Sequence, residues 1–423
     1  EHMDYCLENG LDSWALTDHG HMNGYGYAQL YSQKLRKKGL DFKFIPGCEM
    51  YVHPSLETWK LDYELRAARK RGDKTAEAVL RKQREELSTP IVAITDSDDE
   101  ILDVGIDDAS LTVENEEETK STKFYDPIKR RHHLVVLPKT SKGLERLFGL
   151  VSRGYTEGFY RFPRVDYKML KEAAEGGHLM VSTACLGGPL AYEVFQRLQK
   201  VEFENLTHDL LNNKPMFEKI IAGVGNSFDQ LSHAVGRKNV CLELQFNKLN
   251  AQHLVNRAII EFANRENLHD QLIVTCDSHY ARPEHWKERE IYKKLGWLNY
   301  TDYDPSSLPQ TKDDLKCELY PKNATQVWES YISTTEGMSF YDDKIVKDAI
   351  ERTHSIAHDV IGDINPDCSM KLPSYVVPKD TTADKALVSM CKKALIEKGL
   401  QDDPVYVNRV VHELKIIKEK KFS

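Results

Sequence analysis

The stretch ALTDHGHMNG occupies residues 15–24. In this stretch an apolar pair, Ala15-Leu16, runs directly into an acid and an imidazole, Asp18-His19, and a glycine follows at once. A short apolar run that ends in polar residues is typical of a buried strand. The same arrangement recurs along the chain, so we predict a set of strands that carry polar side chains at their ends.

Six such strands are predicted, and helical patterns lie between most of them. The predicted strands are Trp14–Thr17, Phe44–Tyr51, Leu134–Leu137, Leu179–Ser182, Val240–Gln245 and Leu272–Thr275. The helices among them are Tyr25–Lys38, Ser141–Val151, Gly188–Leu198 and Asn250–Glu266. Strands that alternate with helices predict an α/β fold with a parallel sheet or barrel. In such folds the functional groups gather where the strands end and the next loops begin.

The composition narrows the class of protein. The 423 residues are enough for two or three domains, and 40% hydrophobic with 29% charged residues is ordinary for a globular protein. There is no run of about 20 apolar residues, so we expect no membrane span. The net charge of −8 argues against a surface that coats nucleic acid throughout, although a local basic groove stays open. Eight scattered cysteines without a C-x-x-C pair predict reduced thiols and a cytoplasmic location.

Two stretches interrupt the strand and helix pattern. Residues 54–90 are highly charged with a helical pattern, and residues 96–120 hold eleven acids. We interpret 54–131 as a charged insertion, a helical hairpin followed by a poorly ordered acidic loop. Residues 201–232 are interpreted as a smaller polar insertion.

The strand pattern stops after about residue 300, and helices dominate from there. The helices expected in this region are Lys312–Leu319, Ala324–Ser333, Asp342–Ile361, Ala383–Lys398 and Val405–Lys420, with an extended segment at 372–378. We therefore expect a first domain over residues 1–290 and a second, mainly α region over 291–423. Helical sequence begins at once after Glu1 and ends close to Ser423, so we expect a fragment truncated at both ends.

Residues of the types that bind metal ions lie at the ends or the start of five of the predicted strands. They are Asp18 with His19, Glu49, the pair His132-His133, Cys185, and Asp277 with His279. Imidazoles, carboxylates and thiolates bind metal ions, and such groups around two or more cations are the usual equipment for phosphoester hydrolysis. Each group alone has an ordinary structural explanation, but their recurrence favours one shared metal site.

Neighbouring residues of a strand face opposite sides, so at most one of His132 and His133 can join that site.

Several separated motifs occur in an order that matches a known family. They include ALTDHGHMNG, IPGCEMYV, HHLVVLPKTSKGLERLFGLVSRGYTEGFY, VSTACLGG, IVTCDSHYARPEHW and LPSYVVPKDTTADKALVSMC. Together these motifs resemble the N-terminal part of the bacterial C-family replicative DNA polymerases, the alpha subunits of DNA polymerase III. The resemblance covers nearly the whole chain except 54–131 and about 201–232.

This resemblance implies a PHP (polymerase and histidinol phosphatase) domain over residues 1–290, followed by the start of the polymerase palm region. The domain is expected to be a distorted seven-stranded β/α barrel with up to three metal ions, Zn²⁺ or Mn²⁺. The implied ligands are His19, Glu49, His133, Cys185, Asp277 and His279, with Glu49 bridging two ions. Asp18 is expected to orient the His19 ring without binding a metal ion itself. The family's first strand, which carries H-x-H, is absent from this sequence, so the barrel is expected to lack one strand.

The resemblance also implies an activity for the parent protein. That activity is synthesis of DNA from dNTPs on a primer-template, with Mg²⁺, a sliding clamp and a proofreading exonuclease subunit as partners. The PHP part is expected either to act as a metal-dependent 3′–5′ exonuclease or to scaffold a proofreading subunit. We find no D-x-D pair set in a strand within 291–423, so this chain alone is not expected to polymerise DNA. Two alternatives stay open: a stand-alone PHP phosphoesterase for a small phosphate ester, and a non-catalytic structural module.

Overall fold

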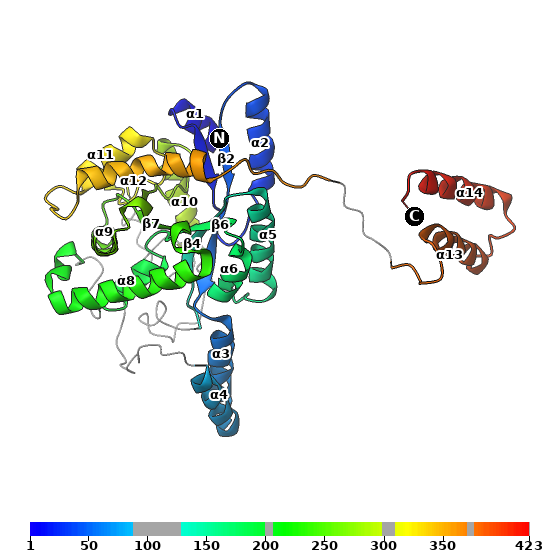
Figure 1. Cartoon of the computed structure of the whole chain (residues 1–423), viewed down its shortest axis with the longest axis horizontal. Helices are drawn as coiled ribbons and strands as arrows, with labels where there is room; N and C mark the ends of the chain where they lie inside the picture. The colour runs from blue at the N-terminus through cyan, green and yellow to red at the C-terminus, as the bar shows by residue number, and fades with distance from the viewer. Residues whose placement is uncertain (88–127, 199–205, 298–308, 370–375, 423) are drawn as a thin grey trace. The chain divides into compact units, whose positions relative to one another are not determined.

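The computed structural model describes residues 1–87, 128–198, 206–297, 309–369 and 376–422. These residues form two compact units, Glu1–Pro366 and Asp367–Ser423 (Figure 1). The strands of the first unit are β1 (Ser13–Leu16), β2 (Lys43–Pro46), β3 (Cys48–His53), β4 (His132–Pro138), β5 (Arg164–Asp166), β6 (Leu179–Ser182), β7 (Val240–Leu244) and β8 (Leu272–Val274). Together with the helices below they confirm the predicted α/β class.

The helices of the first unit alternate with these strands over much of its length. They are α1 (His2–Glu8), α2 (Tyr25–Lys37), α3 (Leu56–Arg71), α4 (Lys74–Glu86), α5 (Ser141–Thr156), α6 (Tyr167–Ala174), α7 (Pro189–Phe195), α8 (Lys214–Val235), α9 (Asn250–Glu266), α10 (Trp286–Trp297), α11 (Ala324–Thr334) and α12 (Asp343–Ser355). Short 3₁₀ turns cover η2 (His208–Asn212), η3 (Arg237–Asn239), η4 (His269–Gln271), η5 (Pro283–His285) and η7 (Lys312–Asp314), and a π-helical turn forms η8 (Ile356–Val360).

The described strands form two sheets. β1 and β2 pair in parallel, and the other six lie in the order β5-β3-β4-β6-β7-β8. An isolated bridge between His19 and Glu49 continues the line of β1 alongside β3 and so joins the small sheet to the large one. The predicted strand Phe44–Tyr51 is therefore two strands, which separate at Gly47.

The expected parallel sheet is confirmed for most strand pairs, and β4 is an exception to it. β4 runs antiparallel to both of its neighbours, β3 and β6, whereas the remaining pairs of the large sheet are parallel. In the register of β3 and β4, Val52 at the end of β3 lies opposite His132 at the start of β4. The chain thus leaves β3 and enters β4 at the same end of the two strands, so the strands run in opposite directions. Residues at the start of β4 therefore lie near the ends of β3 and β6.

Residues 54–131 begin with the predicted helical hairpin. α3 and α4 pack against each other and project from the sheet (Figure 1). The side chain of Ser55 caps α3, the side chain of Asp73 caps α4, and Gly72 ends α3 in the left-handed conformation. The predicted acidic loop falls on residues 96–120, which lie outside the described residues.

The interpretation of residues 201–232 as a polar insertion is wrong, because this segment contributes apolar residues to the core. Most of its second half is α8, whose buried apolar residues include Ile220, Val224, Phe228 and Leu231 at helical spacing. These side chains belong to the main hydrophobic core, together with residues of β4, β6, β7 and α9. α8 therefore packs as a structural helix of the domain.

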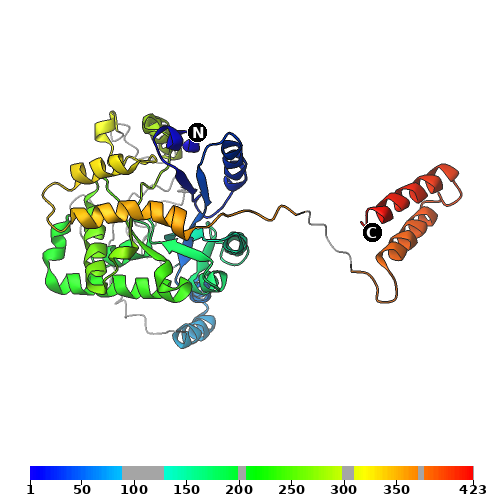
Figure 2. The same ribbon diagram turned by 45° about the horizontal axis from the view of Figure 1, so that its top comes forward.

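The first compact unit extends well beyond the expected boundary at residue 290. Val327 and Tyr331 of α11 and Val346 and Ala349 of α12 belong to the same core as the sheet. Helix α12 (orange in Figure 2) lies alongside the strands of the first unit, and it contacts β8 directly. The contacts of the chain separate only at Pro366.

The expected helix Lys312–Leu319 is wrong beyond its first turn. The described residues form only the 3₁₀ turn η7, and its capping box uses Thr311 and Asp314. The Asp314 carboxylate accepts hydrogen bonds from the backbone N–H groups of Gln310 and Thr311. Such local side-chain bonds favour a turn over a continuing helix. The chain then places Leu315 and Leu319 in a small apolar cluster around Tyr280.

The second unit consists of two helices, α13 (Ala383–Glu397) and α14 (Pro404–Glu419), which contact each other. The side chains of Thr382 and Asp403 cap their N-termini. Both helices match the prediction, whereas part of the expected extended segment 372–378 lies outside the described residues. Across the parts of the chain that the structure describes, no helix combines the length and the apolar character required to cross a membrane.

We predict that Phe228→Ala lowers the free energy of unfolding by about 3–5 kcal/mol, because a buried aromatic ring is replaced by a cavity. Phe228 is fully buried and lies against Phe262, with ring centroids 5.3 Å apart. The matched control is Gln230→Ala, an exposed position on the same helix, for which we expect a change within about 0.5 kcal/mol. Urea unfolding measures both. Equal small effects would show that α8 is peripheral to the core.

We also predict that stability falls below pH 6.5 through His253. This buried side chain joins α9 to Tyr341, whose hydroxyl lies 2.9 Å from Nδ1. Burial lowers the pKa of His253 to about 4, from the usual 6.5. The unfolded state therefore binds more protons between these two values, and the stabilisation present above pH 6.5 is lost as the pH falls toward 4.

The expected loss from His253 is about 3 kcal/mol between pH 7 and pH 4. His253→Gln should flatten this part of the stability curve, whereas His412→Gln, an exposed control on α14, should leave it unchanged. Urea unfolding at a series of pH values provides the comparison. A wild-type slope in His253→Gln contradicts the assignment.

Candidate metal centre

His19 is positioned by a loop that is bonded to β3. The N–H of Glu49 donates to the carbonyl of Asp18 (3.0 Å), and the N–H of Gly20 donates to the carbonyl of Glu49 (2.8 Å). Gly20 has a φ of +68°, and a Cβ there would lie 2.9 Å from Pro163 and 3.1 Å from Tyr51. Only glycine fits this turn without strain. The loop thus holds the His19 imidazole over the first residues of β3.

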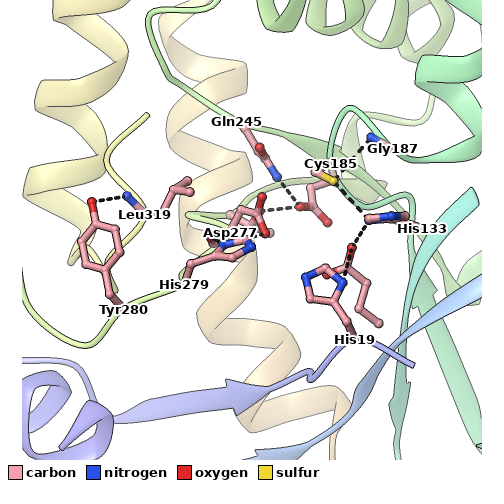
Figure 3. Close-up of polar contacts among 12 residues, drawn as sticks. His19, His133, Cys185, Gly187, Gln245, Asp277, His279, Tyr280 and Leu319 are labelled. Atoms are coloured by element: carbon pink, nitrogen blue, oxygen red, sulfur yellow. Dashed lines mark hydrogen bonds and ion pairs between the residues drawn. The ribbon is translucent and has the colours of Figure 1, made fainter. Parts of the chain in front are cut away.

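Glu49 and His133 meet across neighbouring strands. His133 Nδ1 lies 2.7 Å from Glu49 Oε1, and His19 Nδ1 lies 3.8 Å from the same oxygen. The ligand atoms of His19, Glu49 and His133 all lie within 4.8 Å of one another. Figure 3 shows the imidazoles of His19 and His133 side by side. Glu49 is the second residue of β3 and lies opposite Val135 of β4, so His133, two residues before Val135, is its diagonal neighbour on the same face of the sheet. His132 faces away and packs against Tyr192 (ring centroids 4.6 Å), as predicted.

Cys185 lies beside His133 in the loop after β6. Its Sγ is 3.7 Å from His133 Nδ1 and accepts a contact from the N–H of Gly187 at 3.4 Å. The carbonyl of Gly187 accepts the N–H of His133 (2.9 Å). A Cβ at Gly187 would lie 3.0 Å from the His133 ring, so the small residue lets this loop close over the imidazole. The thiol and the imidazole are therefore held as one unit.

Asp277 and His279 come from the loop after β8. The ring of His279 lies 5.7 Å from that of His19 between centroids, so this loop faces the loop after β1 (Figure 3). Asp277 has a φ of +47°, which is uncommon for a residue with a Cβ. The carbonyl of Leu319 accepts hydrogen bonds from the N–H groups of His279 and Tyr280. The segment after η7 thus supports the loop from behind.

The structure therefore gathers all six predicted ligands in one region, which we call the candidate metal centre. It consists of His19, Glu49, His133, Cys185, Asp277 and His279. The six side chains differ in how closely they converge. Among the described residues, the group whose ligand atoms lie close enough for a single ion at this place is His19, Glu49 and His133.

Asp18 acts on the loop and not on the His19 ring as expected. Its carboxylate accepts the N–H of Gly24 at 3.0 Å and lies 3.7 Å from His21 Nδ1. Its carbonyl accepts the N–H of Glu49 (3.0 Å). Asp18 therefore shapes the turn that carries His19.

The electrostatics of the candidate metal centre favour a cation. Burial by itself raises the pKa of Glu49, but the hydrogen bond and positive charge of His133, with smaller effects of His19 and His279, hold it below its usual value. Burial raises the pKa of Asp277, and the nearby Glu49 carboxylate adds to this. Burial and the Asp277 and Glu49 charges also raise the pKa of the Cys185 thiol well above its usual range. A bound cation lowers the pKa values of Asp277 and Cys185 because it stabilises their carboxylate and thiolate forms.

One buried atom supports this assignment. His19 Nδ1 is buried and has no hydrogen-bond partner among the described residues. Its 3.8 Å separation from Glu49 Oε1 is too long for a hydrogen bond. A buried polar atom without a partner costs about 1–3 kcal/mol. A metal ion shared by His19, Glu49 and His133 satisfies this nitrogen, so the residues present fit a metal.

Sequence reasoning missed Glu243, which is buried in β7 near Asp277. Gln245 Nε2 donates to Glu243 Oε1 (3.0 Å), and the hydroxyls of Ser182 and Thr275 also donate to this carboxylate. Burial raises its pKa, the three hydrogen bonds lower it, and the Asp277 charge raises it. The signal was an acid in the middle of the apolar run VCLEL at residues 240–244. Through these hydrogen bonds, Glu243 of β7 connects β6 with the loop after β8, which carries Asp277 and His279.

A cavity of about 520 Å³ opens beside His279. His285 and Arg289, together with Tyr280, contribute to its wall, and so do the carboxylates of Glu1 and Glu288. Basic and hydrogen-bonding side chains next to a metal centre are suited to an anionic ligand such as a phosphate.

Comparison with known proteins places these features in a family. The PHP domain family matches residues 1–247. The chain is 28% identical to the DNA polymerase III subunit alpha of Aquifex aeolicus over 318 residues, which are 72% of this chain and 24% of that protein. It is 24% identical to that of Campylobacter jejuni over 70% of this chain and 24% of the relative. It is 30% identical to that of Thermus aquaticus over 38% of this chain and 11% of the relative.

The chain thus spans about a quarter or less of the length of these relatives. The matched residues include the loops of His19, Glu49, His133 and Cys185, all within 1–247. The α/β architecture, the strand-end ligands and the matched family agree with one another. The chain belongs to the PHP domain family, and it is homologous to the N-terminal region of DNA polymerase III alpha subunits.

Proposed function

We propose that the chain is part of a replicative DNA-directed DNA polymerase, and that its PHP domain is a metal-dependent phosphoesterase that removes nucleotides from DNA 3′ ends. The observation that carries the hydrolytic part is the buried, unpartnered His19 Nδ1 beside Glu49 and His133. A purely structural cluster gains nothing from an unsatisfied buried nitrogen, whereas a metal site requires one.

The proposed ligands divide into two neighbouring groups. His19, Glu49 and His133 would hold one ion, and Cys185, Asp277 and His279 would contribute to a second, with Glu49 facing both. Zn²⁺ and Mn²⁺ suit this mixture of imidazole, carboxylate and thiolate. When bound, such ions act as Lewis acids on a phosphoester and stabilise its developing negative charge.

The remaining residues position the ligands and the substrate. The loop of Gly187 fixes His133 and Cys185 together, and the hydrogen bonds from the N–H groups of His279 and Tyr280 to the carbonyl of Leu319 fix the loop of His279. His285 and Arg289 in the wall of the cavity would hold the phosphate of a DNA end next to His279. The guanidinium group of Arg289 and a ring N–H of His285 suit a phosphate oxygen.

The polymerase part of the proposal depends on the relatives, which are named as DNA polymerase III alpha subunits. In the parent protein, residues 291–423 would begin the palm region, and later residues would carry the Mg²⁺-dependent synthesis of DNA on a primer-template from dNTPs. A sliding clamp and a proofreading exonuclease subunit are the proposed partners. The proposed location is the cytoplasm, where bacterial replication takes place.

Two other functions fit the same fold. In the first, the metal centre serves only as a structural support that braces the polymerase core and binds a proofreading subunit. In the second, the domain hydrolyses a small phosphate ester and takes no part in replication. The cavity beside His279 has room for a phosphate-bearing ligand next to Arg289 and His285, and the structural alternative does not require such a ligand.

We predict that Glu49→Gln weakens the binding of Zn²⁺ and Mn²⁺ at least 10-fold, because an amide replaces the carboxylate shared by both imidazoles. The matched control is Glu145→Gln, an exposed glutamate on α5, which should bind metal as the wild type does. Equilibrium dialysis followed by elemental analysis gives the affinity. Wild-type affinity in Glu49→Gln would remove this residue from the site.

We further predict that the chain loaded with Mn²⁺ or Zn²⁺ shortens a 5′-labelled DNA strand, and that Asp277→Asn reduces this rate at least 100-fold. Asp270→Asn, an exposed control before β8, should retain the wild-type rate. Unchanged DNA with bound metal, and a lower melting temperature in Asp277→Asn, supports the structural alternative. Hydrolysis of p-nitrophenyl phosphate without shortening of DNA supports the small-ester alternative.

A further inference from the structure

A second group of metal-binding side chains lies apart from the candidate metal centre. His354 is on the last turn of α12, His358 is in the π-helical turn η8, and Asp12 lies just before β1. His354 Nδ1 is 3.3 Å from Asp12 Oδ2, and His358 Nε2 is 3.1 Å from Asp12 Oδ1. The ligand atoms of all three residues lie within 4.8 Å of one another. Residues distant in the sequence thus present two imidazoles and one carboxylate to the same point.

The backbone around these residues is fixed. Ala357 and Ile361 are buried in a core cluster with Ile45 and Met180, so the opposite face of the η8 turn is held against the sheet. This burial directs His354 and His358 outward. The two imidazoles lie on one side of the helix, as expected for residues four apart, with ring centroids 4.4 Å apart.

Lys43 connects the two sides of this group. Its backbone N–H donates to the carbonyl of Asp12 at 2.8 Å, and its ammonium group donates to the carbonyl of Ile361 directly after η8. The hydroxyl of Ser13 donates to Asp12 Oδ1 at 2.9 Å and orients the carboxylate. The three ligands are therefore held in place by contacts that do not involve a metal.

An ion pair is the ordinary explanation for a histidine beside an aspartate. An ion pair needs one imidazole beside the carboxylate, whereas here two imidazoles with ring centroids 4.4 Å apart both face the carboxylate of Asp12. A neutral imidazole offers a nitrogen lone pair to a metal ion. Two imidazole nitrogens and one carboxylate oxygen are a common ligand set for Zn²⁺, with a water as the fourth ligand.

We propose that Asp12, His354 and His358 form a second binding site for a divalent transition metal of the Zn²⁺ type. This site shares no residue with the candidate metal centre. The two sites lie at opposite ends of β1, because Asp12 precedes this strand and His19 follows it. Seven residues of extended chain span about 20 Å. The metal ties the end of the first compact unit, at α12 and η8, to the loop before β1. It stabilises the domain and is not required for hydrolysis.

The experiment measures Zn²⁺ bound per chain in wild type, Asp12→Asn and His358→Ala by equilibrium dialysis and elemental analysis. We expect each variant to lose one equivalent of Zn²⁺ and to keep the ions of the candidate metal centre. The Glu49→Gln chain, measured in parallel, shows how much Zn²⁺ that centre binds. The matched control is His412→Ala, an exposed helical histidine on α14 without this geometry, which should lose none. Far-ultraviolet circular dichroism checks that every variant is folded.

A second readout follows the stability of the domain. Zn²⁺ should raise the melting temperature of the Glu49→Gln chain, and the additional change Asp12→Asn should abolish that increase. Equal Zn²⁺ content in wild type, Asp12→Asn and His358→Ala overturns the proposal, and so does an equal loss in His412→Ala. Because the melting temperature is measured in the Glu49→Gln background, failure here leaves the proposed hydrolytic function standing, and failure of that function leaves this site standing.

Discussion

The backbone pairing between residues 18–20 and Glu49 is the constraint on which the candidate metal centre depends. Two hydrogen bonds, from the N–H of Glu49 to Asp18 and from the N–H of Gly20 to Glu49, join the two-stranded sheet to the six-stranded sheet. They place the His19 ring over the start of β3, where Glu49 points. Without this pairing, the first loop and the large sheet have no shared ligand set. The positive φ of Gly20 makes the pairing possible.

The direction of β4 is the second constraint. β4 runs antiparallel to β3 in a register that sets Glu49 opposite Val135 and Tyr51 opposite His133. His133 is thus the diagonal neighbour of Glu49 on one face of the sheet and lies within hydrogen-bond distance of it. The register of these two strands therefore decides which side chain of β4 faces Glu49.

The proposed second metal site and the candidate metal centre differ in their physical setting. At the candidate metal centre, burial makes the unpaired atom of His19 unfavourable and gives a bound cation a large effect on the carboxylates. At Asp12, His354 and His358 the ligands are partly exposed, so a cation gains less there. A role in holding the fold suits the exposed site, and chemistry on a phosphoester suits the buried one.

The sequence alone predicted the α/β class, most strands and helices, and the six side chains that the fold gathers, because apolar runs and the polar residues that follow them are local patterns. It missed β5, which is only three residues long, and it misjudged α8, whose charged ends conceal a buried face. It also missed Glu243 and the pairing of Asp12 with His354 and His358. The direction of β4, the extent of the first unit to Pro366 and the convergence of residues over 300 positions apart were decided only by the tertiary structure, because they depend on contacts between distant segments that no local pattern records.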